Sequence, residues 1–314
     1  MKTKLRVRTL SALVLAALIL TGCGGGVPLR WVFPRIFVEV DKDGFPTIAG
    51  ISPAMLSFFG LDPNQFKIDP ATVGKLTNSN LQHVELLFRN DGLYWWVNGK
   101  ALVPLTWDDA SFDNTKDLIN RFVQLDEFTS GVLNNVLLPV ARSMEQNIII
   151  RFPRKDGEAE IPLRDMGGPL PEPGTAVDPS LIGGLRLTFD DAGNPSVAGV
   201  SFSEIEKLAG ADLSAAKLPL DTVQQMKDVG IQHVTIRTTS AGIKIWTNDK
   251  LLPTLSWSEE TLANTADTLA SLELIEPALG AVIKQFLPYL NRADIDLVLK
   301  FPTGGAAPIP EPAR

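Results

Sequence analysis

The sequence has few of the side chains that most often carry chemistry. Its 314 residues include one cysteine, Cys23, and two histidines, His83 and His233. A single cysteine excludes an internal disulfide and leaves no cysteine for a metal site or a nucleophile elsewhere in the chain. A serine hydrolase with a histidine base would have to use one of the two histidines.

Standard catalytic motifs are also missing. The chain contains no G-x-S-x-G, H-E-x-x-H, P-loop or G-x-G-x-x-G pattern. We therefore expect no cofactor and no resident metal ion. A carboxylate-based hydrolase stays open, because any two carboxylates can converge in space, but no pair stands out in the sequence.

The N-terminus has the features of a targeting segment rather than of a membrane span. Four basic residues lie among the first eight, and the apolar stretch Leu10–Leu20 covers eleven residues, whereas a span needs about 20. Leu20-Thr21-Gly22-Cys23 follows directly and resembles the lipobox of bacterial lipoproteins. The resemblance implies that residues 1–22 are a signal peptide and that Cys23 is lipidated. The protein would then be extracytoplasmic and lipid-anchored in the cell membrane or the outer membrane.

The charge balance argues against nucleic acid as a partner. The whole chain carries −7, and loss of the four basic residues of the signal leaves −11. Nucleic-acid binding depends on Lys and Arg that neutralise phosphates. We expect the membrane to be reached through lipidated Cys23, with residues 23–34 as a short tether; about ten residues reach about 30 Å at most.

The remainder of the chain contains one pattern twice. The stretch from about Arg35 to Pro162 recurs, shifted by 149 or 150 positions, from about Leu185 to Pro310. The matches keep their order and include Gln82-His83-Val84 with Gln232-His233-Val234, Trp96 with Trp246, Asn98 with Asn248, Trp107 with Trp257 and Asn114-Thr115 with Asn264-Thr265. We expect two tandem modules, residues 35–162 and 185–310, that pack together, with a Pro/Gly linker at 163–184 and a fraying tail from Gly304.

Each module is predicted to be α+β. Strands and helices occur in blocks, which favours a mainly antiparallel sheet with about four helices. A three-strand meander is expected at His83–Phe88, Leu93–Val97 and Ala101–Leu105, with Asn98-Gly99 as a tight turn. The corresponding meander begins at His233. A short helix is expected near Asp69-Pro70, and its counterpart near Asp221.

One sheet face is the candidate binding face. Alternation along the strands places Leu93, Trp95 and Val97 on one side and Tyr94 and Trp96 on the other. The second side holds a tryptophan among polar residues in both modules, and it includes His83 and His233 if the register aligns the polar sets. Aromatic rings on a polar surface are common anchors for partners. Coverage of this face by a helix or by the other module is the alternative. The predicted face comprises Trp96, Trp246, Tyr94, His83 and His233.

Three other features each have a structural interpretation. Trp107 and Trp257 precede helix starts and fit a hydrophobic staple with residues five positions later. The segments beginning at Asp41 and Asp190 resemble the opening of a calcium loop but lack its later ligands, so we expect hairpin turns. The apolar segments around Pro139 and Pro288 are expected to be core helices, with a lipid pocket as the alternative.

These observations favour a membrane-anchored binding or scaffolding unit over an enzyme. Two homologous modules often pack about a pseudo-twofold axis, and the groove between them is then the default site for an envelope protein or a small ligand. A carrier of an apolar ligand and, less favoured, a carboxylate-based hydrolase are the alternatives.

Overall fold

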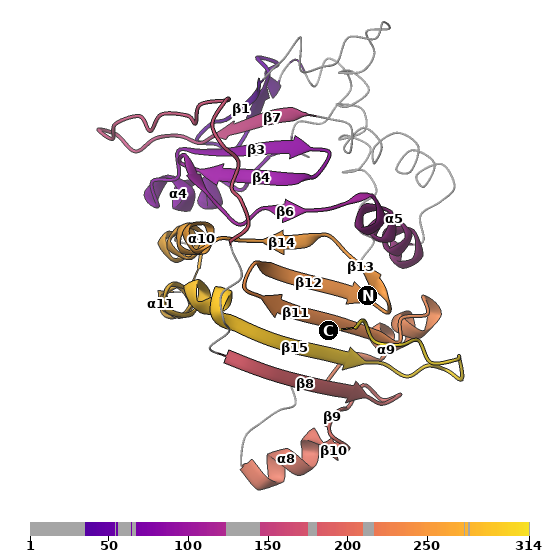
Figure 1. Cartoon of the computed structure of the whole chain (residues 1–314). Coiled ribbons are helices and arrows are strands. Elements are labelled where there is room, and N and C mark those ends of the chain that lie inside the picture. Colours follow the sequence, from indigo (N-terminus) through magenta and orange to yellow (C-terminus); the bar gives the residue numbers. More distant parts are fainter. Residues whose placement is uncertain are drawn as a thin grey trace, which may run out of the picture. The chain divides into compact units, whose positions relative to one another are not determined.

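A computed structural model of the chain describes residues 35–53, 55, 64, 67–123, 145–174, 181–209, 217–272, 274–275 and 277–313 (Figure 1). The predicted signal peptide, Cys23, the tether and Pro139 lie outside these residues. Within them, no helix has the length and apolar character needed to cross a membrane.

The α+β prediction is confirmed. The described residues form fifteen strands in a mixed, mostly antiparallel arrangement and six α-helices. They divide into two compact units: unit 1 takes its residues from 1–104, 127–171 and 259–288, and unit 2 takes its residues from 105–126, 172–258 and 289–314.

Unit 1 is built on a sheet with the strand order β2-β1-β7-β3-β4, in which β5 also pairs with β4. Only β1 and β7 pair in parallel. The elements of unit 1 are β1 (Arg35–Val40), β2 (Pro46–Ile48), α4 (Pro70–Asn78), β3 (His83–Arg89), β4 (Gly92–Val97), β5 (Lys100–Ala101), β7 (Gln146–Arg151), α10 (Glu259–Ser271) and α11 (Pro277–Phe286).

Unit 2 is built on a sheet with the order β10-β9-β8-β15-β11-β12-β14-β6, in which β13 also pairs with β12. Its parallel pair is β8 and β15. The elements are β6 (Leu105–Thr106), α5 (Asp109–Val123), β8 (Leu181–Phe189), β9 (Pro195–Val197), β10 (Val200–Ser201), α8 (Phe202–Ala209), α9 (Leu220–Asp228), β11 (His233–Thr239), β12 (Gly242–Thr247), β13 (Lys250–Leu251), β14 (Thr254–Ser256) and β15 (Ala293–Lys300). A 3-10 helix, η4 (Leu287–Arg292), follows α11.

Local sequence explains where the helices begin. Asp69 accepts a hydrogen bond from the backbone N–H of Thr72, and Pro70 occupies the first turn of α4, as expected. Ser201 and Glu204 form a reciprocal capping box at the start of α8. In α4 the side chains of Val73 and Leu76 are buried.

The core of unit 2 depends on aromatic packing. Phe189 and Phe301 stack with ring centroids 5.7 Å apart, and Ile231 completes the buried cluster. Leu118 of α5 packs against this cluster. Helix α5 therefore contributes to the core of unit 2, although it lies in the first half of the sequence.

Each unit contains one segment from the other half of the chain. In unit 2, the side-chain amide of Asn114 on α5 donates to the backbone carbonyl of Leu251 at 2.8 Å, and α5 lies beside β13 (Figure 1). In unit 1, Asn264 on α10 donates to the carbonyl of Ala101 at 3.0 Å. The two contacts involve matching positions, 150 residues apart.

The third strand of each expected meander is interrupted. The chain forms β5 and β6 where one strand was predicted, and β13 and β14 in the second half. Pro104 and Pro253 stand at the breaks. Proline has no N–H for the ladder, which explains why these strands divide.

The segments at Asp41 and Asp190 are hairpin turns, as expected. Asp41 Oδ1 accepts from the backbone N–H groups of Asp43 and Phe45, and Asp190 makes the equivalent contacts. A Cβ on Gly44 would lie 1.8 Å from the carbonyl oxygen of Ile68. Only glycine fits there, and its φ is +85°.

Candidate functional site

The strand register confirms that the polar sets share one sheet face. Glu85 lies directly opposite Trp96 on β4 and opposite Ile149 on β7, and Leu87 lies opposite Tyr94. Cross-strand partners point to the same side of a sheet. Tyr94, Trp96 and His83 are thus on one face of unit 1, and the register of β11 and β12 puts His233 and Trp246 on the matching face of unit 2.

This face is buried in unit 1. The exposed fraction is 2% for Trp96, 3% for His83 and 0% for Glu85. Residues 155–165, a turn followed by a segment without regular secondary structure, make hydrogen bonds to it, and we call this segment strap 1. The predicted aromatic face is therefore covered, which corresponds to the alternative of internal coverage; the cover is neither a helix nor the other module but a strap of the same unit.

The side chain of Gln82 binds the backbone of strap 1. Its side-chain amide donates to the carbonyl of Ala159 and accepts from the N–H of Ile161, both at 2.9 Å. One amide side chain thus pairs with two main-chain groups of an extended segment, as a neighbouring strand would.

Arg164 of strap 1 contacts both Trp96 and Glu85 on this face. Its guanidinium lies 4.0 Å from the ring centroid of Trp96, within the range of a cation–π contact. It also donates to Glu85 Oε1 from Nη2 at 3.1 Å and from Nε at 3.3 Å. Asn147 donates to the same oxygen at 3.0 Å. A carboxylate with no exposed surface is thereby compensated by a cation, as a buried charge requires.

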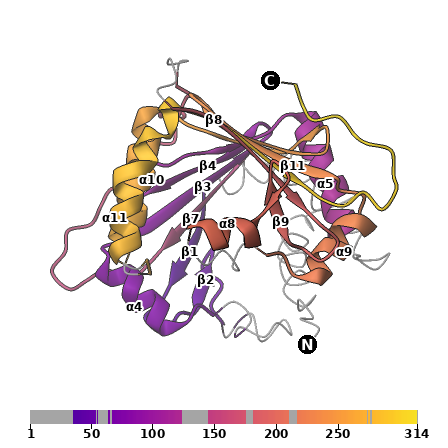
Figure 2. The same ribbon diagram turned by 90° about the horizontal axis from the view of Figure 1, so that it is seen from below.

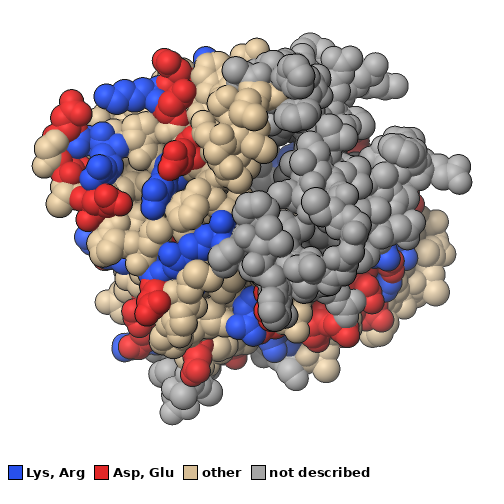
Figure 3. Space-filling model, turned by 90° about the horizontal axis from the view of Figure 1, so that it is seen from above, with Lys and Arg blue, Asp and Glu red and all other residues tan. Residues whose placement is uncertain are grey.

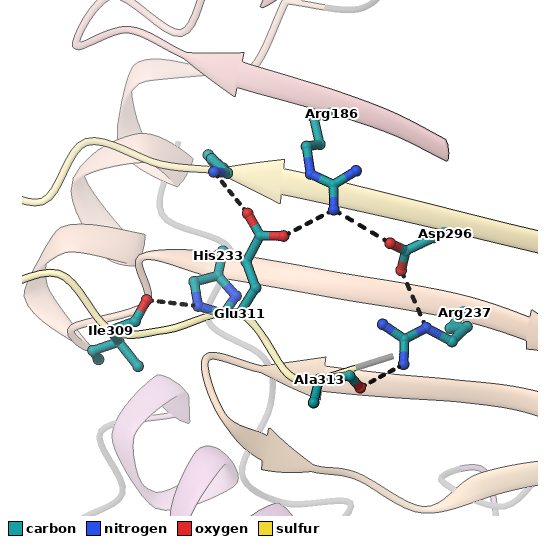
Figure 4. A network of polar contacts seen from close by, with 8 residues as sticks. Arg186, His233, Arg237, Asp296, Ile309, Glu311 and Ala313 are labelled. Carbon is teal, nitrogen blue, oxygen red and sulfur yellow. Dashed lines mark hydrogen bonds and ion pairs between the residues drawn. The ribbon is translucent and has the colours of Figure 1, made fainter. Parts of the chain in front are cut away.

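The corresponding face of unit 2 is held in the same way by residues 303–313, which we call strap 2 (Figure 4). Gln232 donates to the carbonyl of Ala307 at 2.7 Å and accepts from the N–H of Ile309 at 2.8 Å. His233 Nε2 lies 3.2 Å from the carbonyl oxygen of Ile309. The expectation that the tail frays from Gly304 is wrong, because these hydrogen bonds attach it to the sheet.

The charges under strap 2 form a chain of ion pairs. Asp296, 2% exposed, pairs with Arg237 at 3.2 Å and with Arg186 at 3.4 Å. Glu311 of strap 2 pairs with Arg186 at 3.1 Å and with Lys300 at 2.7 Å (Figure 4). Arg237 lies 5.1 Å from the ring centroid of Trp246 and donates to the carbonyl of Ala313.

Both faces thus combine tryptophan, arginine and carboxylate, but from different positions. In unit 1 the carboxylate is Glu85 on β3, beside Asn147 on β7. In unit 2 Thr235 occupies the position of Glu85, and Asp296 on β15 occupies that of Asn147. Compared with unit 1, the carboxylate of unit 2 lies on the adjacent strand. In each unit a guanidinium near the tryptophan compensates the charge of the carboxylate.

The environment shifts several ionisation equilibria. Burial lowers the pKa of His83, an effect that Glu85 partly opposes. Burial also raises the pKa of the Tyr94 phenol. A hydrogen bond from Lys300 lowers the pKa of Glu311, and a hydrogen bond from Arg186 adds to this. His83 is thus favoured in its neutral form and Glu311 in its charged form.

The residues that organise these faces were not among the predicted site residues. They are Gln82, Gln232, Glu85, Arg164, Arg237 and Asp296. The available signal was the repeated Gln-His-Val together with the doublets Ile161-Pro162 and Ile309-Pro310. No group of three or more His, Cys, Asp or Glu among the described residues is placed to hold a metal ion.

The tryptophans at the helix starts have structural roles. The ring of Trp107 contacts that of Phe112, with centroids 5.8 Å apart, which confirms the staple before α5. Trp257 and Leu262 are 2% and 1% exposed, in agreement with a core position.

Helix α11 exposes apolar side chains that were expected in a core. Leu279, Val282 and Phe286 are 53%, 51% and 59% exposed. The helix packs on α10 (Figure 2), where Gly280 lies close to Ala270 and Lys284 pairs with Asp267. The prediction that Phe286 belongs to a core helix is wrong, because the packed side of α11 is the side of Gly280. The chain changes to a 3-10 helix at Leu287-Pro288, as expected for a proline that cannot continue an α-helix.

In the view of Figure 3, Lys and Arg side chains lie among Asp and Glu side chains on the described residues that face the viewer. Comparison with protein-family models, with curated proteins and with solved structures found no match to this chain.

Proposed function

We propose that this protein is an extracytoplasmic lipoprotein, anchored through lipidated Cys23, that acts as a non-enzymatic binding or scaffolding unit. The observation that carries the proposal is the way both units hold an extended segment. Gln82 and Gln232 each pair with two main-chain groups of a strap over an aromatic and charged face. The same recognition occurs twice, at matching positions.

The chemistry of these contacts supports binding. Main-chain hydrogen bonds give affinity to an extended segment, and flanking side chains give specificity, as in other modes of peptide recognition. Glu85 and Asp296, the most buried carboxylates among the residues that the structure describes, form ion pairs on these faces. In this proposal these ion pairs have a structural role.

In the same proposal, residues 35–162 and 185–310 are two copies of one module that exchange helices. Helix α5 comes from the first copy and contacts β13 of the second, and α10 comes from the second copy and contacts β5 of the first. Reciprocal exchange is a known route to symmetric pairs of identical folds. It would pack the two copies together and yield a duplicated scaffold.

The anchoring is tested on protein extracted from the membranes of its host. We expect the N-terminal peptide of the mature chain to begin at Cys23 and to carry an acyl mass, and we expect Cys23→Ala to leave the membrane fraction. An unmodified Cys23 in a soluble protein would contradict this part of the proposal.

The binding role is tested by native mass spectrometry of residues 24–314 secreted by the same host. We expect the mass of the chain alone or with a bound polypeptide. A reproducible small-molecule mass that is lost on denaturation would replace this proposal with that of a ligand carrier. A purified chain that turns over glycoside or ester substrates, with loss of activity in a carboxylate variant, would replace it with that of a hydrolase.

A further inference from the structure

The two straps share a short motif. Strap 1 contains Ala159-Glu160-Ile161-Pro162, and strap 2 contains Ala307-Pro308-Ile309-Pro310. The alanine carbonyl and the isoleucine N–H are the atoms that Gln82 and Gln232 bind. Gly157 and Gly305, two residues before each motif, both have positive φ. Both faces therefore bind the main chain of an Ala-x-Ile-Pro segment that follows a glycine with positive φ.

The straps differ in the charges that fix them. Arg164 of strap 1 is 11% exposed in its side chain and meets Glu85 on the sheet. Strap 2 carries the opposite charge, Glu311, which meets Arg186 and Lys300. In strap 2, Glu311 directly follows Ile-Pro and pairs with basic side chains of unit 2. In strap 1, Arg164 lies two residues after Ile-Pro and pairs with the carboxylate of Glu85 in unit 1.

The printed contacts of strap 2 with unit 2 are polar and lie close to solvent. Residues 303–308 are exposed, and Glu311 retains 27% exposure in its side chain, with Arg186 at 47%. Its attachment consists of polar contacts to main-chain atoms and of partly exposed ion pairs, which contribute little each. Segments with few buried apolar contacts open at low free-energy cost.

We propose that the face of unit 2 beneath strap 2 is a recognition site for an extended Ala-x-Ile-Pro-Glu segment of another protein, with strap 2 as its resident competitor. The inference rests on the proposed binding function and names the class of partner. Gln232 and His233 contact the main chain of the segment, and Arg186 and Lys300 select the acidic residue. Because the resident strap acts at high effective concentration, a partner binds in competition with it.

The test uses a fluorescent peptide with the sequence of residues 303–313 and the chain 24–314. Three forms are compared: the unaltered chain, a variant lacking residues 303–314, and a full-length variant with strap 2 weakened by Ile309→Gly and Glu311→Ala. Circular dichroism and thermal melting establish that each form is folded. We expect saturable 1:1 binding to the two altered forms and at least about tenfold weaker apparent binding to the unaltered chain.

Matched substitutions identify the site. In the weakened background, Gln232→Ala should reduce affinity about tenfold or more, since two hydrogen bonds are lost. Gln82→Ala, the same change in unit 1, should leave it unaltered. A peptide with Lys in place of Glu311 should bind weakly, and Lys300→Glu should restore part of that loss.

Three outcomes would overturn the inference. The first is that a folded altered form shows no saturable binding up to about 1 mM peptide. The second is that Gln82→Ala and Gln232→Ala reduce the affinity equally. The third is that both altered forms fail to fold, which would make strap 2 an indispensable part of unit 2. The lipid on Cys23 is measured independently. A negative peptide result with an acylated Cys23 therefore rejects this site alone, and an unmodified Cys23 with normal peptide binding rejects the anchoring alone.

Discussion

Asn264 donates a hydrogen bond to the backbone carbonyl of Ala101, 163 positions earlier in the chain, at 3.0 Å. The matching residue Asn114 donates to Leu251, 137 positions later, at 2.8 Å. The neighbouring Thr265 hydroxyl accepts from the N–H of Val103. An asparagine side chain thus joins α5 of the first half to β13 of the second half, and another joins α10 of the second half to β5 of the first half. Each of the two contacts lies within one compact unit.

Removal of either asparagine side chain should weaken the fold by a similar amount. We expect Asn114→Ala and Asn264→Ala each to lower the free energy of unfolding by about 1 kcal/mol, because a backbone carbonyl loses its partner. The double variant should show the sum. Chemical denaturation measures this, with Asp113→Ala on the exposed side of α5 as the control. Loss confined to one of the two variants would contradict a reciprocal role.

We expect that the buried carboxylate of unit 1 can be moved from Glu85 on β3 to position 147 on β7 with part of the stability retained. Glu85→Thr alone removes the partner of Arg164 and leaves a largely buried cation, so we expect a loss of about 3 kcal/mol. The double change Glu85→Thr with Asn147→Asp reproduces the Thr235 and Asp296 arrangement of unit 2. It should recover part of that loss. A double variant no more stable than Glu85→Thr would show that Arg164 cannot reach the adjacent strand.

His83 should make stability depend on pH. Burial lowers its pKa below the ordinary value of 6.5. As the pH falls below about 6.5, the unfolded chain therefore takes up a proton before the folded chain does, and the free energy of unfolding decreases until the folded-state pKa is passed. Urea denaturation between pH 8 and 5.5 should show this slope. The slope should be reduced in His83→Gln; an unchanged slope would assign it to other groups.

Glu311 should respond in a lower pH range. Its pKa is lowered from the ordinary 4.5 by hydrogen bonds from Lys300 and Arg186. The stabilisation is complete above about pH 4.5 and is lost as the pH falls through the folded-state pKa. The protection factor of the Ile309 N–H, which is the intrinsic exchange rate divided by the observed rate, should therefore decrease below that pH. In Glu311→Gln the protection factor should be lower already at neutral pH and should change less with acid.

The exposed side of α11 should tolerate polar substitution. We expect Leu279→Ser and Phe286→Ser to change the free energy of unfolding by no more than about 0.5 kcal/mol. Val73→Ala, which truncates a residue only 1% exposed, should cost about 2 kcal/mol. Thermal and urea melts measure the difference. A large loss in Phe286→Ser would place that ring in a packed interface.

The sequence alone determined the local structure and the sides of the strands. Alternation predicted that Tyr94 and Trp96 share a face, and Asp69-Pro70 predicted the start of α4. Asn98 and Gly99 have positive φ, as the predicted turn requires. These features depend on residues a few positions apart, so that steric preference and side-chain periodicity are sufficient to predict them.

The tertiary structure decided what covers these elements. Strap 1 reaches Gln82 from 77 and 79 positions away, and α10 reaches Ala101 from 163 positions away. No local pattern records such a pairing. The alternation that placed Trp96 among polar residues is the same sequence pattern in two different environments. It occurs whether the polar groups face water or face Arg164 and a buried carboxylate. Only the long-range approach of a second segment, which removes water and supplies the opposite charge, distinguishes the two.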